Sequence, residues 1–297
     1  MSKVKHIVAV CAFLSPFLCL AEGANSQKSW LLMADYQYRA SDAISRSGGV
    51  QGEYGRSRSG VEAIYQTDTA SVDLEYYLYH HRFSGAVLGT DRAYGDTSDL
   101  MLTGYKQWRG GPKYGVQLIY ALEAAAEESL SLEDGLRWGL GAAVRWQPDA
   151  ETDVALGVLL EDRLESSLLP IPYLKAVWRP CHWGEVELRA TGLQNGIIFR
   201  GFPSEDRATS FDFSVLYETL TFQLAEGSYG SRAVAIGEVP IRIGVTQFLE
   251  SSGTWFIRVS GEWVPFARHS FKHQGQARGA FEPGGTWGMA ARLGARF

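Results

Sequence analysis

Residues 136–146 read Leu-Arg-Trp-Gly-Leu-Gly-Ala-Ala-Val-Arg-Trp, and every second residue, from Leu136 to Trp146, is apolar. In a β-strand successive side chains point to opposite faces, so this pattern places one apolar face along the strand. Residues 153–161 and 287–297 repeat the alternation. The chain is therefore predicted to be all-β.

The first residues are predicted to form a cleaved signal peptide. Two lysines among the first five residues precede an apolar stretch, Ile7 to Leu20, and Ala21 stands before the expected cut, as in a secretory leader. The apolar stretch is shorter than the roughly 18 residues that a spanning helix needs. We therefore expect a signal peptide at 1–21 and one β-barrel domain at 22–297.

Charge and cysteine content exclude several functions. The whole chain has a net charge of −5, and without the two lysines of the leader 26 bases face 33 acids, giving −7. Nucleic acid is a poor partner for such a chain, because phosphate binding needs clustered positive charge. Two of the three cysteines lie in the leader, which leaves Cys181. Neither an intramolecular disulfide nor a cysteine metal cluster is expected.

The tryptophans indicate a membrane rather than a soluble sheet sandwich. All nine fall near the ends of predicted strands, where an amphipathic indole favours the boundary between bilayer and water. A soluble core would bury several at mid-strand. The predicted membrane girdle comprises Trp30, Trp108, Trp138, Trp146, Trp178, Trp183, Trp255, Trp263 and Trp287.

The last residue of the sequence, Phe297, lies on the apolar face of the strand predicted over 286–297. This resembles the carboxy-terminal signal of bacterial outer-membrane barrels, which end on such a phenylalanine. The resemblance implies that the barrel-assembly machinery of a Gram-negative outer membrane reads this strand as its assembly signal.

Fourteen strands are predicted, in a single antiparallel transmembrane barrel with short periplasmic turns and longer outer loops. An even number is expected because both ends of a bacterial barrel normally face the periplasm. The candidates are 30–40, 50–66, 70–84, 98–108, 113–125, 135–147, 152–163, 171–179, 184–191, 196–202, 208–225, 233–248, 254–264 and 286–297.

Three stretches fit this pattern less well. Residues 196–202 are short for a tilted spanning strand, which needs about 9 to 11 residues, and twelve strands result if they and a neighbour are loop. Residues 211–225 change apolar phase near Glu218, for which we expect a β-bulge. Residues 265–285 are predicted to be a long outer loop, which either stays outside or folds into the bore.

The alternation also predicts which side chains line the lumen. Acids and bases nearly balance among them, and the best placed are Arg137, Arg145, Asp153, Glu161, Glu185, Glu187, Arg189 and Arg292. These charges either brace the wall or select solutes. If Pro148 to Ala150 form a three-residue turn, Arg145 faces Asp153 and Arg137 faces Glu161, which predicts a ladder of ion pairs.

Motifs of soluble enzymes were sought and not found. The sequence has no Gly-rich phosphate loop, no His-Glu-x-x-His helix and no Gly-x-Ser-x-Gly elbow. His80 and His81, and His269 with His273, are expected to be solvated loop histidines at the outer end. An outer-membrane hydrolase using them is a minor alternative, and no cofactor, metal site or catalytic residue is predicted.

One part of the chain carries a further resemblance. Within residues 139–180 stand Gly-Leu-Gly-Ala-Ala-Val-Arg-Trp-Gln-Pro, then Leu-Pro-Ile-Pro-Tyr and Val-Trp-Arg-Pro. This resembles an uncharacterised bacterial family, a domain of unknown function with a barrel fold, and implies no site residues.

Two hypotheses from different classes follow from these observations. The first is a porin-like passive channel in the outer membrane for small polar solutes, weakly selective because its lining charges nearly cancel. The second is a closed barrel with an envelope-structural or surface-binding role. Outer-membrane lipid is an expected partner in both.

Overall fold

The computed structural model describes residues 28–46, 49–85, 92–164, 166–192, 194–227, 230–249 and 254–297. The predicted signal peptide and its cleavage after Ala21 lie outside these residues. The described part is built almost entirely from strands, with one short 3-10 helix, η1 (Leu132–Gly135). None of its helices is long and apolar enough to cross a membrane.

Seventeen strands form one sheet in the described part of the chain. They are β1 (Ser29–Arg46), β2 (Gly49–Gln66), β3 (Ala70–Ser84), β4 (Thr97–Arg109), β5 (Tyr114–Glu127), β6 (Leu136–Trp146), β7 (Thr152–Arg163), β8 (Ser166–Cys181), β9 (Gly184–Ala190), β10 (Gln194–Gly201), β11 (Thr209–Gly227), β12 (Ser231–Glu238), β13 (Ile241–Phe248), β14 (Trp255–Val264), β15 (Ala267–His273), β16 (Gln276–Pro283) and β17 (Thr286–Arg296).

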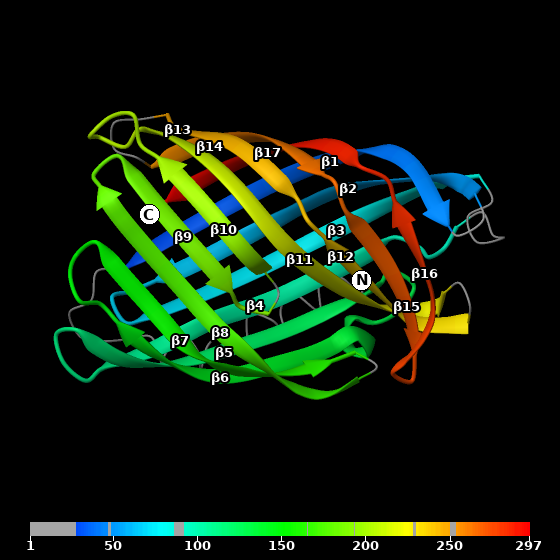
Figure 1. Ribbon diagram of the computed structural model, residues 1–297, viewed down its shortest axis with the longest axis horizontal. Helices are drawn as coiled ribbons and strands as arrows, with labels where there is room; N and C mark the ends of the chain where they lie inside the picture. The colour runs from blue at the N-terminus through cyan, green and yellow to red at the C-terminus, as the bar shows by residue number, and fades with distance from the viewer. Residues whose placement is uncertain are drawn as a thin grey trace.

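Fourteen of these strands close into a ring (Figure 1). β1 to β11 each pair antiparallel with the next, β11 pairs with β13, β13 with β14, β14 with β17, and β17 closes on β1. The closing pair runs from Leu31 opposite Arg296 to Arg39 opposite Gly288. The prediction of a single antiparallel barrel of about fourteen strands is confirmed, and the short 196–202 segment corresponds to β10.

Both described ends of the chain lie at one rim, which we call the terminal rim. There the Trp30 amide donates to the Phe297 carbonyl at 3.0 Å, and the Phe297 amide donates to the Trp30 carbonyl at 2.9 Å. The turns between β2 and β3, β4 and β5, β6 and β7, and β8 and β9 lie at this rim, at the left of Figure 1. The opposite rim is called the far rim.

Three ring strands continue toward the far rim after a break. β12 runs into β13 through Val239 and Pro240, β14 into β15 through Pro265 and Phe266, and β16 into β17 through two glycines. Proline lacks the amide hydrogen that a sheet needs, so it ends regular pairing there. Beyond the breaks β12, β15 and β16 continue the sheet between β11 and β1, and we call this part the bent sheet.

The prediction of a long outer loop at 265–285 is therefore wrong, because these residues form the β15–β16 hairpin. Its tip is tight: Gln274 has φ 51 and Gly275 has φ 75, the pair of positive φ angles that a two-residue hairpin turn adopts. Longer connections at the far rim are found at 85–96 and 128–135, so the predicted difference in loop length holds for these two.

The β-bulge predicted near Glu218 is also wrong. Glu218 lies in an unbroken register with Glu238 of β12 and with Gln194 of β10. What changes is the surroundings of each face of β11. Phe211 and Phe213 are exposed on the outer face, whereas Phe222 and Leu224, on the other face, are completely buried.

This reversal arises because the far half of β11 bends into the barrel with β12, β15 and β16. It reaches the opposite wall: Gln223 pairs in parallel with Ala126 of β5, and the Ala225 amide donates to Glu127 Oε2 at 3.0 Å. The bent sheet encloses a cluster that we call the aromatic plug. The plug comprises Ile44, Tyr54, Tyr77, Tyr79, Ala93, Tyr94, Ala125, Phe222, Leu224, Val234, Ile236, Phe271 and Phe281.

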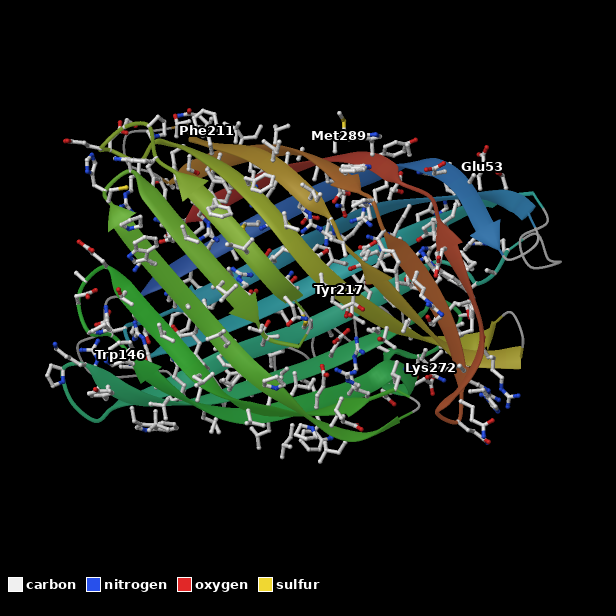
Figure 2. The ribbon with its side chains drawn as sticks, viewed as in Figure 1. Glu53, Trp146, Phe211, Tyr217, Lys272 and Met289 are labelled. Carbon is white, nitrogen blue, oxygen red and sulfur yellow. The ribbon has the colours of Figure 1, made fainter. Side chains whose placement is uncertain are left out.

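The outer surface of the ring is apolar. Leu, Val, Ile and aromatic side chains project from it on β1, β5, β6, β7, β13, β14 and β17. Trp146, Phe211 and Met289 point away from the barrel in Figure 2. A surface of this composition, wrapped around an interior that contains charged residues, is the reverse of a soluble protein.

We expect Phe222→Ala to lower the free energy of unfolding by about 3–5 kcal/mol, because a fully buried phenylalanine leaves a cavity when truncated. Phe211→Ala on the outer face of the same strand is the matched control, since Phe211 is 50% exposed. Urea unfolding in lipid vesicles, followed by tryptophan fluorescence, measures both. Equal losses for the two variants would contradict a packed interior plug.

Candidate functional site

The barrel interior is the candidate site, because the charges that alternate with exposed apolar residues are directed there. Arg137 and Glu123 lie directly opposite each other on β6 and β5 and form a buried ion pair. Arg292 contacts Asp35 at 3.1 Å and Glu62 at 3.2 Å. All eight predicted lining residues take part in ion pairs.

The predicted register of the β6–β7 hairpin is wrong by two residues. Gly139 pairs with Glu161 and Trp146 with Val154, so partner numbers sum to 300 rather than 298. The turn is larger than predicted because Asp149 Oδ1 accepts hydrogen bonds from the Glu151 and Thr152 amides, at 3.0 and 2.7 Å. A two-residue slip keeps every side chain on its face.

One of the two predicted ion pairs forms despite this shift in register, and the other does not. Arg145 still reaches Asp153, with Nη2 to Oδ2 at 2.5 Å, and also donates to Gln107 Oε1 at 2.9 Å. Arg137 pairs with Glu123 instead of Glu161, and Glu161 pairs with Arg163 at 2.9 Å. The partner of Arg137 therefore comes from the preceding strand, β5, which the hairpin argument did not consider.

A second group of charges lines β8, β9 and β10. Glu187 contacts Arg189 at 2.5 Å and Arg200 at 2.9 Å, and Lys175 lies 3.9 Å away. Glu185 contacts Arg200 at 2.5 Å and Arg179 at 2.9 Å. We call these six residues the basic strip, because four bases surround two acids.

The most buried charges tie the bent sheet to the opposite wall. Arg39 of β1 binds both Glu238 of β12 and Glu262 of β14, and Arg56 of β2 binds Glu238 at 2.8 Å. Arg242 joins Glu262 to Glu218. We call these residues the central cluster: Arg39, Arg56, Arg242, Glu218, Glu238 and Glu262. Their side chains are between 3% and 18% exposed, and three charges of each sign compensate one another.

Acidic side chains gather on the strands across the lumen from the basic strip. Carboxylate oxygens of Glu62, Asp73 and Glu75 all lie within 4.8 Å of one another. Oxygen ligands at this spacing suit a divalent cation, although acidic groups are common without one. Asp35 lies in the same region, because Arg292 contacts both Asp35 and Glu62, and Arg58 also contacts Asp35.

The expectation of solvated loop histidines is wrong for two of them. His81 lies in β3, buried in the plug, and its ring nitrogens bond to the Tyr54 hydroxyl at 2.9 Å and to Thr97 Oγ1 at 3.0 Å. His269, in β15, bonds to the Tyr94 hydroxyl at 2.7 Å. The alternation of Tyr77, Tyr79 and His81 on one strand face was the sequence signal for this interior.

His80 points the other way and pairs with Asp96 at 2.7 Å. Arg92 contacts the same carboxylate at 3.0 Å. Within the described part of the chain no serine, threonine or cysteine side chain contacts His80, so the arrangement does not supply a nucleophile.

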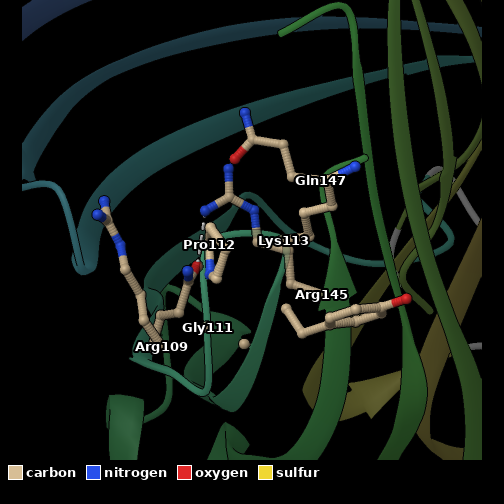
Figure 3. A pocket seen from close by; sticks show the side chains of 9 residues that line it. Arg109, Gly111, Pro112, Lys113, Arg145 and Gln147 are labelled. Atoms are coloured by element: carbon tan, nitrogen blue, oxygen red, sulfur yellow. Dashed lines mark hydrogen bonds between the residues drawn. The ribbon is translucent and has the colours of Figure 1, made fainter. Parts of the chain in front are cut away.

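Two pockets on the described part of the barrel are candidate openings to the interior. A pocket of about 110 Å³ lies at the terminal rim among Gln107, Arg109, Lys113, Tyr114, Arg145 and Gln147 (Figure 3). We call it the terminal pocket. None of the described residues that line it is acidic.

The second opening, the wall groove, has a volume of about 460 Å³. It arises because the β9–β10 hairpin is short, so β8 pairs with β9 only from Leu174 onward and β11 pairs with β10 only up to Glu218. Tyr217 and Lys272, labelled in Figure 2, lie on its β11 and β15 sides. Its lining includes Arg163, Ile171, Pro172, Asn195, Tyr217, Thr219, Phe266, Arg268, Ser270 and Lys272, and no acid is found among the lining residues that the structure describes.

The tryptophans of the predicted girdle are all exposed on the ring. Trp30, Trp108, Trp146, Trp178 and Trp255 lie near strand ends at the terminal rim, with Trp183 in the turn after β8. Trp138 lies near the far end of β6. Trp263 and Trp287 stack at 5.7 Å beside the breaks that precede the bent sheet.

No family model and no curated protein matches the chain. Solved outer-membrane channels resemble it in structure. An outer membrane channel from Pseudomonas putida F1 aligns with a TM-score of 0.46 and 14% identity over 93% of this chain and 99% of its own. The P. putida toluene transporter TodX gives 0.41 and 8% over 92% and 91%, and P. putida OprB gives 0.40 and 6% over 95% and 96%. These values transfer no residue role to this chain.

Removing one acid of the central cluster is expected to be costly. Glu238→Gln leaves Arg39 and Arg56 buried without their shared partner, a change that typically costs about 3–5 kcal/mol of unfolding free energy. Asp153→Asn is the control, because the Arg145–Asp153 pair is 22% and 24% exposed and such pairs contribute about 0–1 kcal/mol. Urea unfolding in vesicles compares them, and a smaller loss for Glu238→Gln than for Asp153→Asn would contradict this account.

Proposed function

We propose that the protein is an integral outer-membrane β-barrel that acts as a porin-like passive channel for small polar solutes. The observation that carries the proposal is the inverted polarity of the ring. Apolar side chains cover its outside, whereas arginines, lysines and carboxylates line its inside. Hydrocarbon stabilises the first surface, and water and polar solutes suit the second.

The proposal also covers the two ends of the chain. The terminal rim, with its short turns, faces the periplasm, and the exposed tryptophans mark the two borders of the bilayer. Residues 1–21 direct export and are removed after Ala21. The last strand, with exposed Phe297, offers the assembly machinery its recognition element.

The solute pathway runs beside the aromatic plug rather than through it. The contact between β5 and β11 divides the far half of the barrel, and the plug fills the part enclosed by β1 to β5 and the bent sheet. The wall groove lies on the other side of this contact. The groove, which is lined by both polar and apolar side chains, and the terminal pocket form the two ends of the proposed route.

A closed barrel with an envelope-structural or surface role is the second candidate. The observation that favours it is the plug itself, which occupies much of the far half. A hydrolase is not proposed, because the His80 and Asp96 pair lacks a nucleophile among the described residues.

Single-channel recording in planar bilayers tests the proposal. The purified, folded mature protein is expected to give stepwise ion current, because water and ions fill a charged lumen. Folding is checked beforehand by its resistance to protease. Folded protein without any current would exclude the channel and favour the closed barrel.

A disulfide across the β5–β11 contact tests the route beside the plug. Ala126→Cys with Gln223→Cys, in a Cys181→Ser background, fixes two residues that already pair directly. Conductance is expected to be the same before and after reduction with dithiothreitol, because the pathway does not require this contact to open. A several-fold rise on reduction would show instead that the plug must move.

A further inference from the structure

Charges of opposite sign are segregated across the lumen, although their totals nearly balance. On β1 to β3, the acids Asp35, Glu62, Asp73 and Glu75 exceed the neighbouring Arg58 and Arg292 by two. In the basic strip on β8 to β10, the four bases exceed Glu185 and Glu187 by two. A balanced total therefore does not imply a neutral path.

The wall groove shares strands β8 to β10 with the basic strip, and the terminal pocket carries bases of its own. The terminal pocket is bordered by β4 to β6 and the wall groove by β7 to β12 and β15, so a route between them meets the basic strip where it reaches the groove. The acidic cluster lies on other strands. The ions that pass would therefore experience mainly the positive field.

The terminal pocket adds free positive charge to this route. Arg109 and Lys113 have no ion-pair partner among the residues that the structure describes, whereas Arg145 is compensated by Asp153. An uncompensated base at a mouth concentrates anions there, since clefts of one sign focus the field.

The wall groove has the same character. Arg163 and Arg268 have acidic partners, Glu161 at 2.9 Å and Glu282 at 3.5 Å, while Lys272 has none in the described part of the chain. The unpaired edges of β8 and β11 border the groove, and their backbone groups require water if no strand covers them. The groove is therefore expected to be wet.

We propose that the wall groove is the outer mouth of the channel and that groove, basic strip and terminal pocket together select small anionic solutes bearing carboxylate or phosphate groups. This inference rests on the proposed channel function and deepens it. It replaces the weak selectivity expected from balanced charge counts.

Reversal potentials in planar bilayers of neutral phosphatidylcholine test the inference, with potassium salts of chloride, acetate and phosphate as probes. The wild-type protein is expected to pass each anion in preference to potassium. Lys175→Gln and Lys272→Gln are each expected to lower the anion-to-cation permeability ratio about tenfold, because one unit charge about 6 Å from a passing ion in water favours an anion about threefold and disfavours a cation about threefold. Raising the salt to 1 M should reduce the preference, because it shortens the screening length to about 3 Å.

Lys106→Gln is the matched control for both variants. Lys106 lies on β4 near the terminal rim, alternates with the inward-facing Gln107 and lines neither opening. Its loss should leave the permeability ratio unchanged. Unitary conductance is recorded for each variant, because it shows that the variant forms a folded channel.

The outcomes separate this inference from the channel proposal. Current that is unselective, or that favours potassium, overturns the inference and leaves the channel intact. An anion-to-cation permeability ratio that falls with Lys175→Gln but not with Lys272→Gln would show that the wall groove is not the outer mouth. Absence of current overturns both.

Discussion

The central cluster is the interaction on which the interior depends. Arg39 on the first strand holds Glu238 and Glu262 on strands that are distant in sequence, and these contacts anchor the base of the bent sheet. Buried charges are stable only when they are paired with good geometry. Removing one partner therefore leaves the other charge buried and uncompensated. The plug above the cluster and the groove beside it both require the bent sheet to stay where the cluster fixes it.

Sequence pattern predicted the ring well because its signals are local. Period-two alternation and turn residues define strands such as 70–84 and 152–163, which the structure reproduces residue for residue as β3 and β7. The bent sheet was missed for the opposite reason. Phe271 and Phe281 pack against strands that are far away in sequence. Alternation alone does not show whether an apolar face contacts lipid or the protein interior.

The lining residues were found more readily than their partners. Alternation places Arg137 and Glu161 on a face, but their pairing depends on a turn whose size Asp149 sets through its two hydrogen bonds. Because a slip of two residues preserves faces, the error in register changed the partner of Arg137 without moving its side chain to another face. The central cluster joins six strands, and no single hairpin contains the information that assembles it.

Selectivity follows from which charges are left uncompensated rather than from how many there are. In the central cluster, three bases and three acids cancel at short range and leave little field for a solute. Lys113 and Lys272, which lack acidic partners in the described chain, act at longer range because nothing beside them neutralises their charge. A count of inward-facing charges treats both groups alike, and the resulting near-zero sum hides a positive path along β8 to β10 and a negative wall on β1 to β3. The direction of the field across the lumen is therefore a property of the pairing, which only the folded ring determines.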